Sequence, residues 1–292
     1  MVIGAGIYIL VGPATAHAGG LVWLSMLVAG ALCALTAFSY MELTSMFPKS
    51  GSEYEFARQV FPDWIAFATG WAMTMALVVA SAAVGLGFAR YLNVFFDVNE
   101  RLAALALIVT VGIIALTGMQ HAKWLVILLS AVQIGGLLLV IAFGFHHVGD
   151  VSLTSGHGFS GVLGGASVIF FAYIGFDAIS TTAEECENPQ RDLPRGMMWA
   201  IIICTILYIL IALILTGIVS YKSLAVGDPL AFVFDSINLK KMSGIISISA
   251  VIAMASVLLV FQMGQPRIWM SMSRDGLLPK KFSKIHPKYK TP

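Results

Sequence analysis

The chain has 292 residues, of which 59% are hydrophobic and 11% are charged, and its formal net charge is +2. A soluble domain carries roughly 25% charged residues, so this composition, with a mean hydropathy of +0.89, excludes a soluble globular protein and indicates an integral membrane protein. The three cysteines match neither a disulfide framework nor a metal-binding spacing. The basic residues are spread over short loops, so we expect no nucleic acid partner. We also expect no metal site and no cofactor.

Eight apolar stretches are candidates for membrane-spanning helices, each of which needs about 20 mostly apolar residues. In chain order they are 1–17, 21–47, 64–89, 102–119, 124–145, 162–184, 197–220 and 242–272. The first is short for a complete span, and the segments between the stretches carry turn-forming and charged residues. The sequence therefore predicts an all-α integral membrane protein with about eight transmembrane helices.

The distribution of lysine and arginine predicts the orientation. If the first span runs outward, most of the 17 lysine and arginine residues fall on one side of the membrane. These residues are enriched in cytoplasmic loops. We therefore expect a multi-pass protein of the plasma membrane, surrounded by membrane lipids, with its C-terminal tail in the cytoplasm.

Two of the eight stretches are interrupted near mid-membrane. The first opens with Gly4-Ala5-Gly6 and continues to Pro13, although in a helix interior glycine costs about 1 kcal/mol and proline about 3 kcal/mol. The sixth carries Gly175, Asp177 and the polar run 180–182. The two stretches lie five spans apart and therefore cross in opposite directions. This pattern is typical of an inverted-repeat transporter with its substrate site at the two breaks.

A broken helix offers polar groups that suit a zwitterion. Breaks in a bilayer are tolerated where they line a cavity or contact protein. A half-helix N-terminus presents free N–H groups and partial positive charge, whereas unwound carbonyls present partial negative charge. A substrate carboxylate can thus take N–H donors around Ile3–Ile7, and its ammonium group can face carbonyls of the sixth span. The glycines of the first span have an alternative use in close helix packing, as in GxxxG seams.

Four stretches carry a resemblance to a known family: GAGIYILVG, YMELTSMFPKSGSEYEF, FFAYIGFDAISTTAEECENPQRDLPRG and RIWMSMSRDGLLPKKFSKIHPKYKTP. They resemble the amino acid–polyamine–organocation (APC) superfamily, and within it the cationic amino acid transporter-like branch. The resemblance implies one transporter domain over 1–292 with a five-plus-five inverted repeat, divided here into 1–146 and 162–292, whose first and sixth helices are broken. It also implies a secondary active amino acid transporter that works by alternating access.

The resemblance assigns residues to the substrate. The carboxylate would be bound by the first-span motif, with Ile7 next to it, and the ammonium group by sixth-span carbonyls. The first-span residues are Ile3, Gly4, Ala5 and Gly6, and the sixth-span residues are Phe171, Ala172 and Ile174.

The resemblance also exposes departures. Compared with the family, the chain is expected to be a fragment that lacks the first half of the first span and everything after the eighth. Proton-coupled relatives carry a lysine in the fifth span, but here Gln133 takes its place and cannot titrate. Ala255 and Ser256 occupy the eighth-span stretch where relatives place cation-site oxygens. The coupling ion therefore stays open between H⁺ and Na⁺.

Several acidic residues have two interpretations. Asp177 lies inside the sixth span, where acids are expensive, and serves either the site and its gate or a structural hydrogen bond at the break. Glu42 is a gate or loop anchor, or else an interfacial carboxylate. Glu184 and Glu185 form either an inner gate with arginines 191 and 195 or a solvated cluster.

Two functions compete with the transporter. One is a non-transporting membrane subunit or an inactive fragment of such a carrier. The other is a membrane-embedded metalloenzyme, which the sequence disfavours because the histidines lie in loops and no HExxH spacing occurs. We therefore expect that the protein is not an enzyme.

Overall fold

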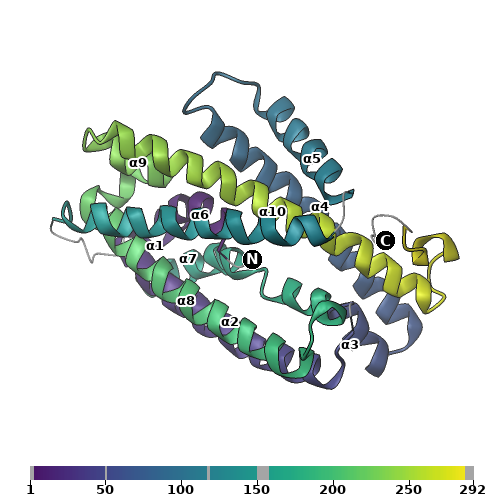
Figure 1. Cartoon of the computed structure of the whole chain (residues 1–292). Coiled ribbons are helices and arrows are strands. Elements are labelled where there is room, and N and C mark those ends of the chain that lie inside the picture. Colours follow the sequence, from purple (N-terminus) through teal and green to yellow (C-terminus); the bar gives the residue numbers. More distant parts are fainter. Residues whose placement is uncertain (1–2, 50, 117–118, 150–157, 287–292) are drawn as a thin grey trace.

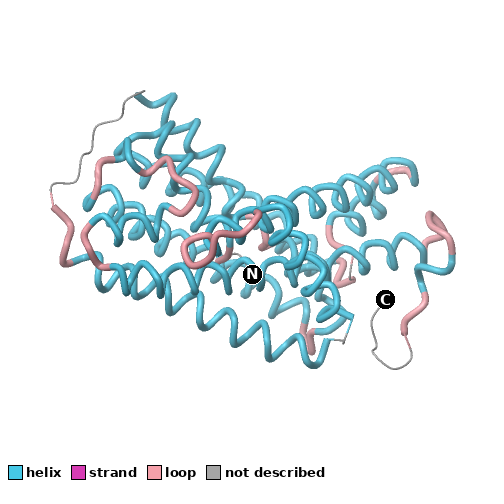
Figure 2. Tube along the Cα trace, turned by 90° about the horizontal axis from the view of Figure 1, so that it is seen from above, coloured by secondary structure: helices cyan, strands magenta, loops and turns pink. Residues whose placement is uncertain are grey.

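The eight predicted stretches all contain helices. The computed structural model describes residues 3–49, 51–116, 119–149 and 158–286, and these form α-helices and short 3-10 helices joined by loops (Figures 1 and 2). The long helices are α1 (Ala5–Ala18), α2 (Val22–Met46), α4 (Asp63–Leu92), α5 (Glu100–Leu116), α6 (Met119–Phe145), α7 (Gly158–Tyr173), α8 (Pro189–Ile218) and α10 (Lys240–Arg274). The short ones are α3 (Glu53–Val60), α9 (Pro229–Ser236), η1 (Gly19–Leu21), η2 (Asp177–Glu185), η3 (Tyr221–Ser223) and η4 (Lys280–Ser283).

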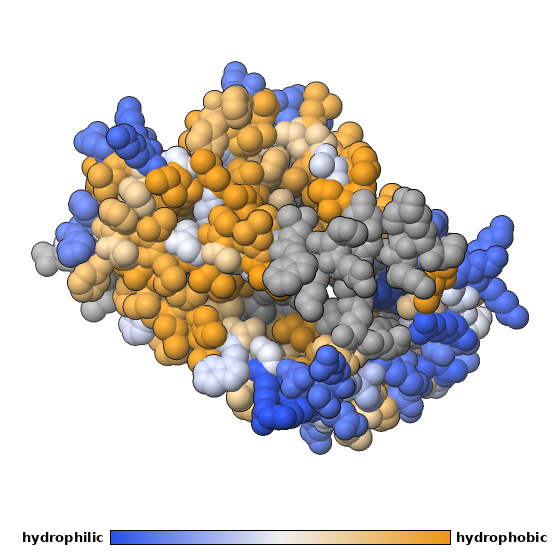
Figure 3. All heavy atoms as spheres, viewed as in Figure 1, coloured by the Kyte–Doolittle hydropathy of each residue, from blue (hydrophilic) through white to orange (hydrophobic). Residues whose placement is uncertain are grey.

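Length and composition suit these helices to a membrane. Among the described residues, five segments are long and apolar enough to cross one, namely Ala5–Met46, Asp63–Leu92, Ile127–Phe145, Pro189–Ile218 and Lys240–Arg274. The first combines α1 and α2, while α5 and α7 are shorter, at 17 and 16 residues. Hydrophobic residues cover much of the visible surface, and hydrophilic residues gather near α3 and the C-terminal segment (Figure 3). The predicted all-α membrane fold is confirmed, whereas the five-plus-five repeat and its limits stay predictions.

The helices pack in two groups. Helices α1, α2, α7 and α8 make their most extensive contacts with one another, whereas α10 packs mainly on α4 and α6 and also contacts α5. Between the groups the contacts are sparser, and α1 touches α4 and α10 over short stretches only. A largely apolar core runs through both groups, with Tyr8, Tyr173 and Tyr208 among its fully buried side chains.

The sixth stretch is interrupted where the sequence predicts a break. Helix α7 ends at Tyr173, a turn follows, and the chain continues as the 3-10 helix η2. Gly175 in this turn has φ = 126°, a conformation that glycine adopts much more readily than other residues. In the first stretch α1 begins at Ala5 with Gly4 as its N-cap, so the helix starts inside the glycine motif. Pro13 lies within α1 without ending it.

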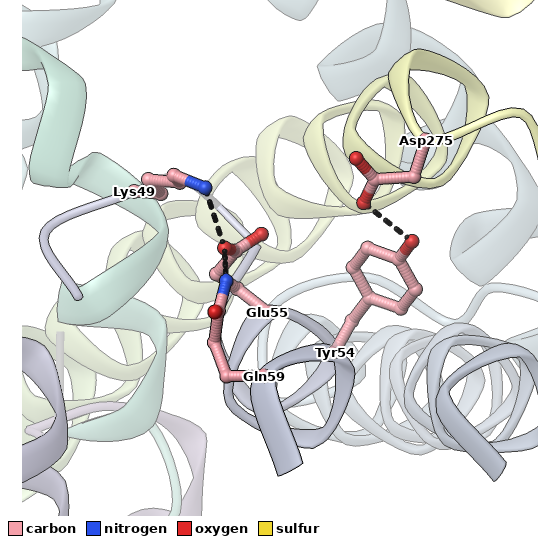
Figure 4. Close-up of polar contacts among 5 residues, drawn as sticks. All are labelled: Lys49, Tyr54, Glu55, Gln59 and Asp275. Atoms are coloured by element: carbon pink, nitrogen blue, oxygen red, sulfur yellow. Dashed lines mark hydrogen bonds and ion pairs between the residues drawn. The ribbon is translucent and has the colours of Figure 1, made fainter. Parts of the chain in front are cut away.

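The two ends of the bundle differ. At one end, called here the α3 end, α3 lies close to η2 and to the last turns of α10, and α9 lies at the opposite end (Figure 1). The Tyr54 hydroxyl donates to Asp275 Oδ2 (2.7 Å), which ties α3 to the residue that follows α10 (Figure 4). Burial, followed by this hydrogen bond, raises the pKa of Tyr54. Lys49 Nζ and Gln59 Nε2 both donate to Glu55 Oε1, at 3.0 and 2.8 Å (Figure 4).

Candidate functional site

The first turn of α1 packs directly on the last turn of α7. Gly6 lies so close to Ala172 that a Cβ atom at position 6 would overlap the Cα and Cβ atoms of Ala172. Ile3, Ala5 and Ile7 are buried around this contact. The structure therefore brings together the two interrupted segments, which are far apart in the sequence.

The groups at this contact have opposite polarity. Gly4 has no side-chain cap, and the first N–H groups of an α-helix have no partner within the helix, so the start of α1 carries partial positive charge. The end of α7 presents carbonyls and partial negative charge. One of them, the carbonyl of Ala172, accepts a hydrogen bond from the Tyr208 hydroxyl (3.2 Å), which leaves it a second lone pair.

A cavity of about 300 Å³ opens beside this contact, between the two packing groups. That volume is at the lower limit of small-molecule sites. The lining includes Phe171, Ile174 and Asp177, but it does not include Ala172 or the described residues of 3–7. Side chains from α2, α4 and α10 complete it, among them Thr36, Tyr40, Met73, Leu77, Ala80, Val260, Phe261 and Ile268. The predicted site is thus divided. Its sixth-span residues Phe171 and Ile174 line the cavity, whereas its first-span residues pack at Ala172 and do not line it.

Asp177 has a structural partner at the break and also faces the cavity. Its Oδ1 accepts the N–H of Gly175 (2.7 Å), and its backbone carbonyl accepts the Ser180 hydroxyl (2.6 Å). Ser180 Oγ also forms a hydrogen bond with Ser52 Oγ (2.7 Å), which connects η2 to the segment before α3. Asp177 therefore makes the structural hydrogen bond that one of its two interpretations requires, and its part in a gate stays a prediction.

The other acidic candidates contribute less to the site. Glu42 is exposed near the end of α2 and does not line the cavity. The side chains of Glu184 and Glu185 lie outside what the structure describes, so the inner-gate hypothesis for them stays a prediction.

Sequence reasoning missed one carboxylate that lines the cavity. The Tyr40 hydroxyl donates to Glu53 Oε1 (2.5 Å), and Glu53 Oε2 is buried without a hydrogen-bond partner among the described residues. Glu53 follows Ser52, which has a positive φ of 51°. The stretch SGSEYEF contains this glutamate, but its spacing alone gives no sign that the side chain returns to the second span.

The coupling candidates lie around α1, α6 and α10. Gln133 is buried on α6, and its side-chain Oε1 has no hydrogen-bond partner in the part of the chain that the structure describes. The Tyr8 hydroxyl hydrogen-bonds Ser249 Oγ (3.0 Å) and donates to the Gln133 carbonyl at 3.4 Å, so these three helices meet here. Ala255 and Ser256 lie further along α10, before the residues that line the cavity. Their role in ion coupling stays a prediction.

The fold defines a polytopic helical membrane protein with a cavity between two packing groups. A family model described as amino acid permease matches residues 1–292, so the chain belongs to the amino acid permease family. It is 35% identical to a methylthioribose transporter and 34% identical to the branched-chain amino acid permease BcaP, both of Bacillus subtilis (strain 168), over its whole length. It is also 36% identical to the vacuolar cationic amino acid transporter 4 of Arabidopsis thaliana over 99% of its length.

The chain spans 68% of each bacterial relative and 53% of the plant relative. These matches are to permeases and transporters, so the protein is a membrane protein of a transport family and not an enzyme. They support amino acid transport as its general function.

Proposed function

We propose that the chain carries out, as a secondary active transporter, the uptake or exchange of an amino acid zwitterion that binds where α1 begins and α7 ends. The observation that carries this proposal is the contact of Gly6 with Ala172, because it sets a positive helix N-terminus beside a negative helix C-terminus. Each such dipole interaction contributes about 0.3–1 kcal/mol, and up to about 2 kcal/mol where partly buried. Several together give the modest affinity of a carrier that must release its cargo.

The cavity supports a route to that position. Phe171 and Ile174, on either side of Ala172, are 40% and 37% exposed and line the cavity. At the α9 end, Gly12 is so close to the Leu224 carbonyl oxygen that a Cβ atom would lie 2.6 Å from it. The route is therefore open toward the α3 end and closely packed toward the α9 end. The sparse contacts between the two packing groups support alternating access by movement of one group against the other.

The remaining expectations are part of the same proposal. We infer an amino acid substrate, H⁺ or Na⁺ as the coupling ion, a plasma membrane location and a cytoplasmic C-terminal tail, which makes the α3 end cytoplasmic. The relatives are named for methylthioribose, branched-chain amino acids and cationic amino acids, so their names leave the side-chain preference open.

Thiol labelling tests the site. Ile174→Cys, made together with Cys186→Ser, places a thiol in the cavity while Cys33 and Cys204 remain buried. The amino acid mixture is used at ten times the total concentration that half-saturates the protein. We expect it to slow labelling by a water-soluble maleimide roughly tenfold, since only empty sites react. Lys281→Cys, on an exposed residue outside the cavity, is the control and should label at an unchanged rate. Equal rates at position 174 with and without amino acids would overturn the proposal.

A further inference from the structure

The charged residues that line the cavity are all of one sign. Of the described residues that line it, Glu53 and Asp177 are the only ones with a formal charge at neutral pH, and both are acidic. The rest of the lining is apolar apart from the hydroxyl groups of Thr36, Tyr40, Ser52 and Thr181. A positively charged group in this cavity would therefore meet no lining residue that repels it.

The Glu53 carboxylate is held in place on one side only. Tyr40 donates to Oε1 at 2.5 Å, and its ring packs edge-on against Phe56 and Phe176, with centroids 5.9 and 5.4 Å away. Oε2 is buried and accepts no hydrogen bond from any group that the structure describes. A buried acceptor without a partner is unfavourable, and such an atom in a native structure calls for a ligand or another explanation.

The neighbouring cation of the same segment is already paired. Lys49 forms its ion pair with Glu55, which lies two residues beyond Glu53. Within the described residues, the ion pairs engage Glu55, Asp63 and Glu100 and leave Glu53 without a cation. Glu53 therefore lines the cavity without an ion pair to any described basic side chain.

We propose that Glu53, positioned by Tyr40 and assisted by the negative charge of Asp177, binds the ammonium or guanidinium group of a cationic amino acid side chain. This inference rests on the proposed function, because it assumes that the amino acid head group sits at the breaks beside the same cavity. The charged group donates to Glu53 Oε2. Phe171 and Phe176 also line the cavity, and aromatic rings near a cation can stabilise it.

A matched pair of substitutions tests this site in the purified full chain by titration calorimetry with arginine and with leucine. Glu53→Gln keeps an acceptor for Tyr40 but removes the charge. Glu55→Gln removes the same charge from the same helix, outside the cavity and beside Lys49 and Gln59 (Figure 4). We expect Glu53→Gln to weaken arginine binding about tenfold and to leave leucine binding unchanged, and Glu55→Gln to leave both unchanged.

The outcomes separate this inference from the proposed function. If the wild-type chain binds neither amino acid, both fail. If it binds leucine but not arginine, or if Glu53→Gln weakens both to the same degree, the proposed function stands and the cation site is overturned. The titrations are run in sodium and in choline chloride. A sodium effect that Glu53→Gln removes, with arginine binding unchanged, would assign the site to an inorganic cation and overturn the inference.

Discussion

The two interrupted segments look alike in sequence and differ in structure. Around the start of α1, Ile3, Ala5 and Ile7 are buried, and Gly6 is pressed against the backbone of Ala172. The break after α7 is held by a side chain and borders a cavity, and its glycine has a positive φ. In the first segment glycine is needed because a side chain at Gly6 would overlap Ala172. In the second it is needed because Gly175 has a positive φ.

This difference explains how the proposed site can be closely packed on one side and accessible on the other. The first segment supplies a fixed helix end, because its neighbours leave no room for it to shift. The second supplies the opening, because a turn replaces the helix where Phe171 and Ile174 reach the cavity. Substitutions that add volume should therefore act most strongly in the first segment, and those that restrict φ should act in the second.

Gly6→Leu is expected to have the largest effect. Its side chain would overlap the backbone of Ala172, and overpacking of this kind costs about 1–3 kcal/mol or more, so the two helix ends must separate. We expect uptake of a labelled amino acid in proteoliposomes to fall to background while the chain still inserts into membranes. Gly135→Leu is the control, because nothing lies within 4 Å of a Cβ atom at that position. Uptake at the wild-type level in Gly6→Leu would remove the first segment from the site.

Gly175→Ala is expected to have the next largest effect, on stability. A non-glycine residue at φ = 126° is strained by about 1–3 kcal/mol, so the melting temperature in detergent should fall. Gly196→Ala provides a contrast of opposite sign. It lies exposed inside α8 with open space around it, and alanine there should stabilise the helix by about 0.5–1 kcal/mol. An unchanged melting temperature for Gly175→Ala would show that the turn relaxes without cost.

Part of this arrangement could be predicted from the sequence. Long apolar stretches place the helices, and the combination of Gly175, Asp177 and a polar run locates the sixth-span break, because each of these signals is local. The contact of Gly6 with Ala172 joins residues far apart in the chain, and the motif itself fits packing and binding equally well. The break pattern indicated that the two segments belong to one site, but not which part of it would face the cavity.

Glu53 shows most clearly what the sequence does not specify. Its position depends on the turn at Ser52 and on the docking of α3 against α10 through Tyr54 and Asp275. Both are tertiary features, and the hydrogen bond from Tyr40 exists only after they form. A glutamate in a polar loop is usually solvated, so no local pattern distinguishes this one from its neighbour Glu55.

Asp177 offers the smallest and most specific test of the second break. Gly175 is buried, and its N–H donates to Asp177 Oδ1, so Asp177→Ala removes the acceptor and should cost about 0.5–1.5 kcal/mol in the free energy of unfolding. Asp177→Asn retains an oxygen at the same place and should cost less, which denaturation in detergent can measure. Equal losses in the two variants would mean that the charge of Asp177, rather than its hydrogen bond, holds the turn. In that case the charge of Asp177, through its interaction with the other groups of the cavity, stabilises the break. The backbone geometry of Gly175 is then a consequence of that interaction.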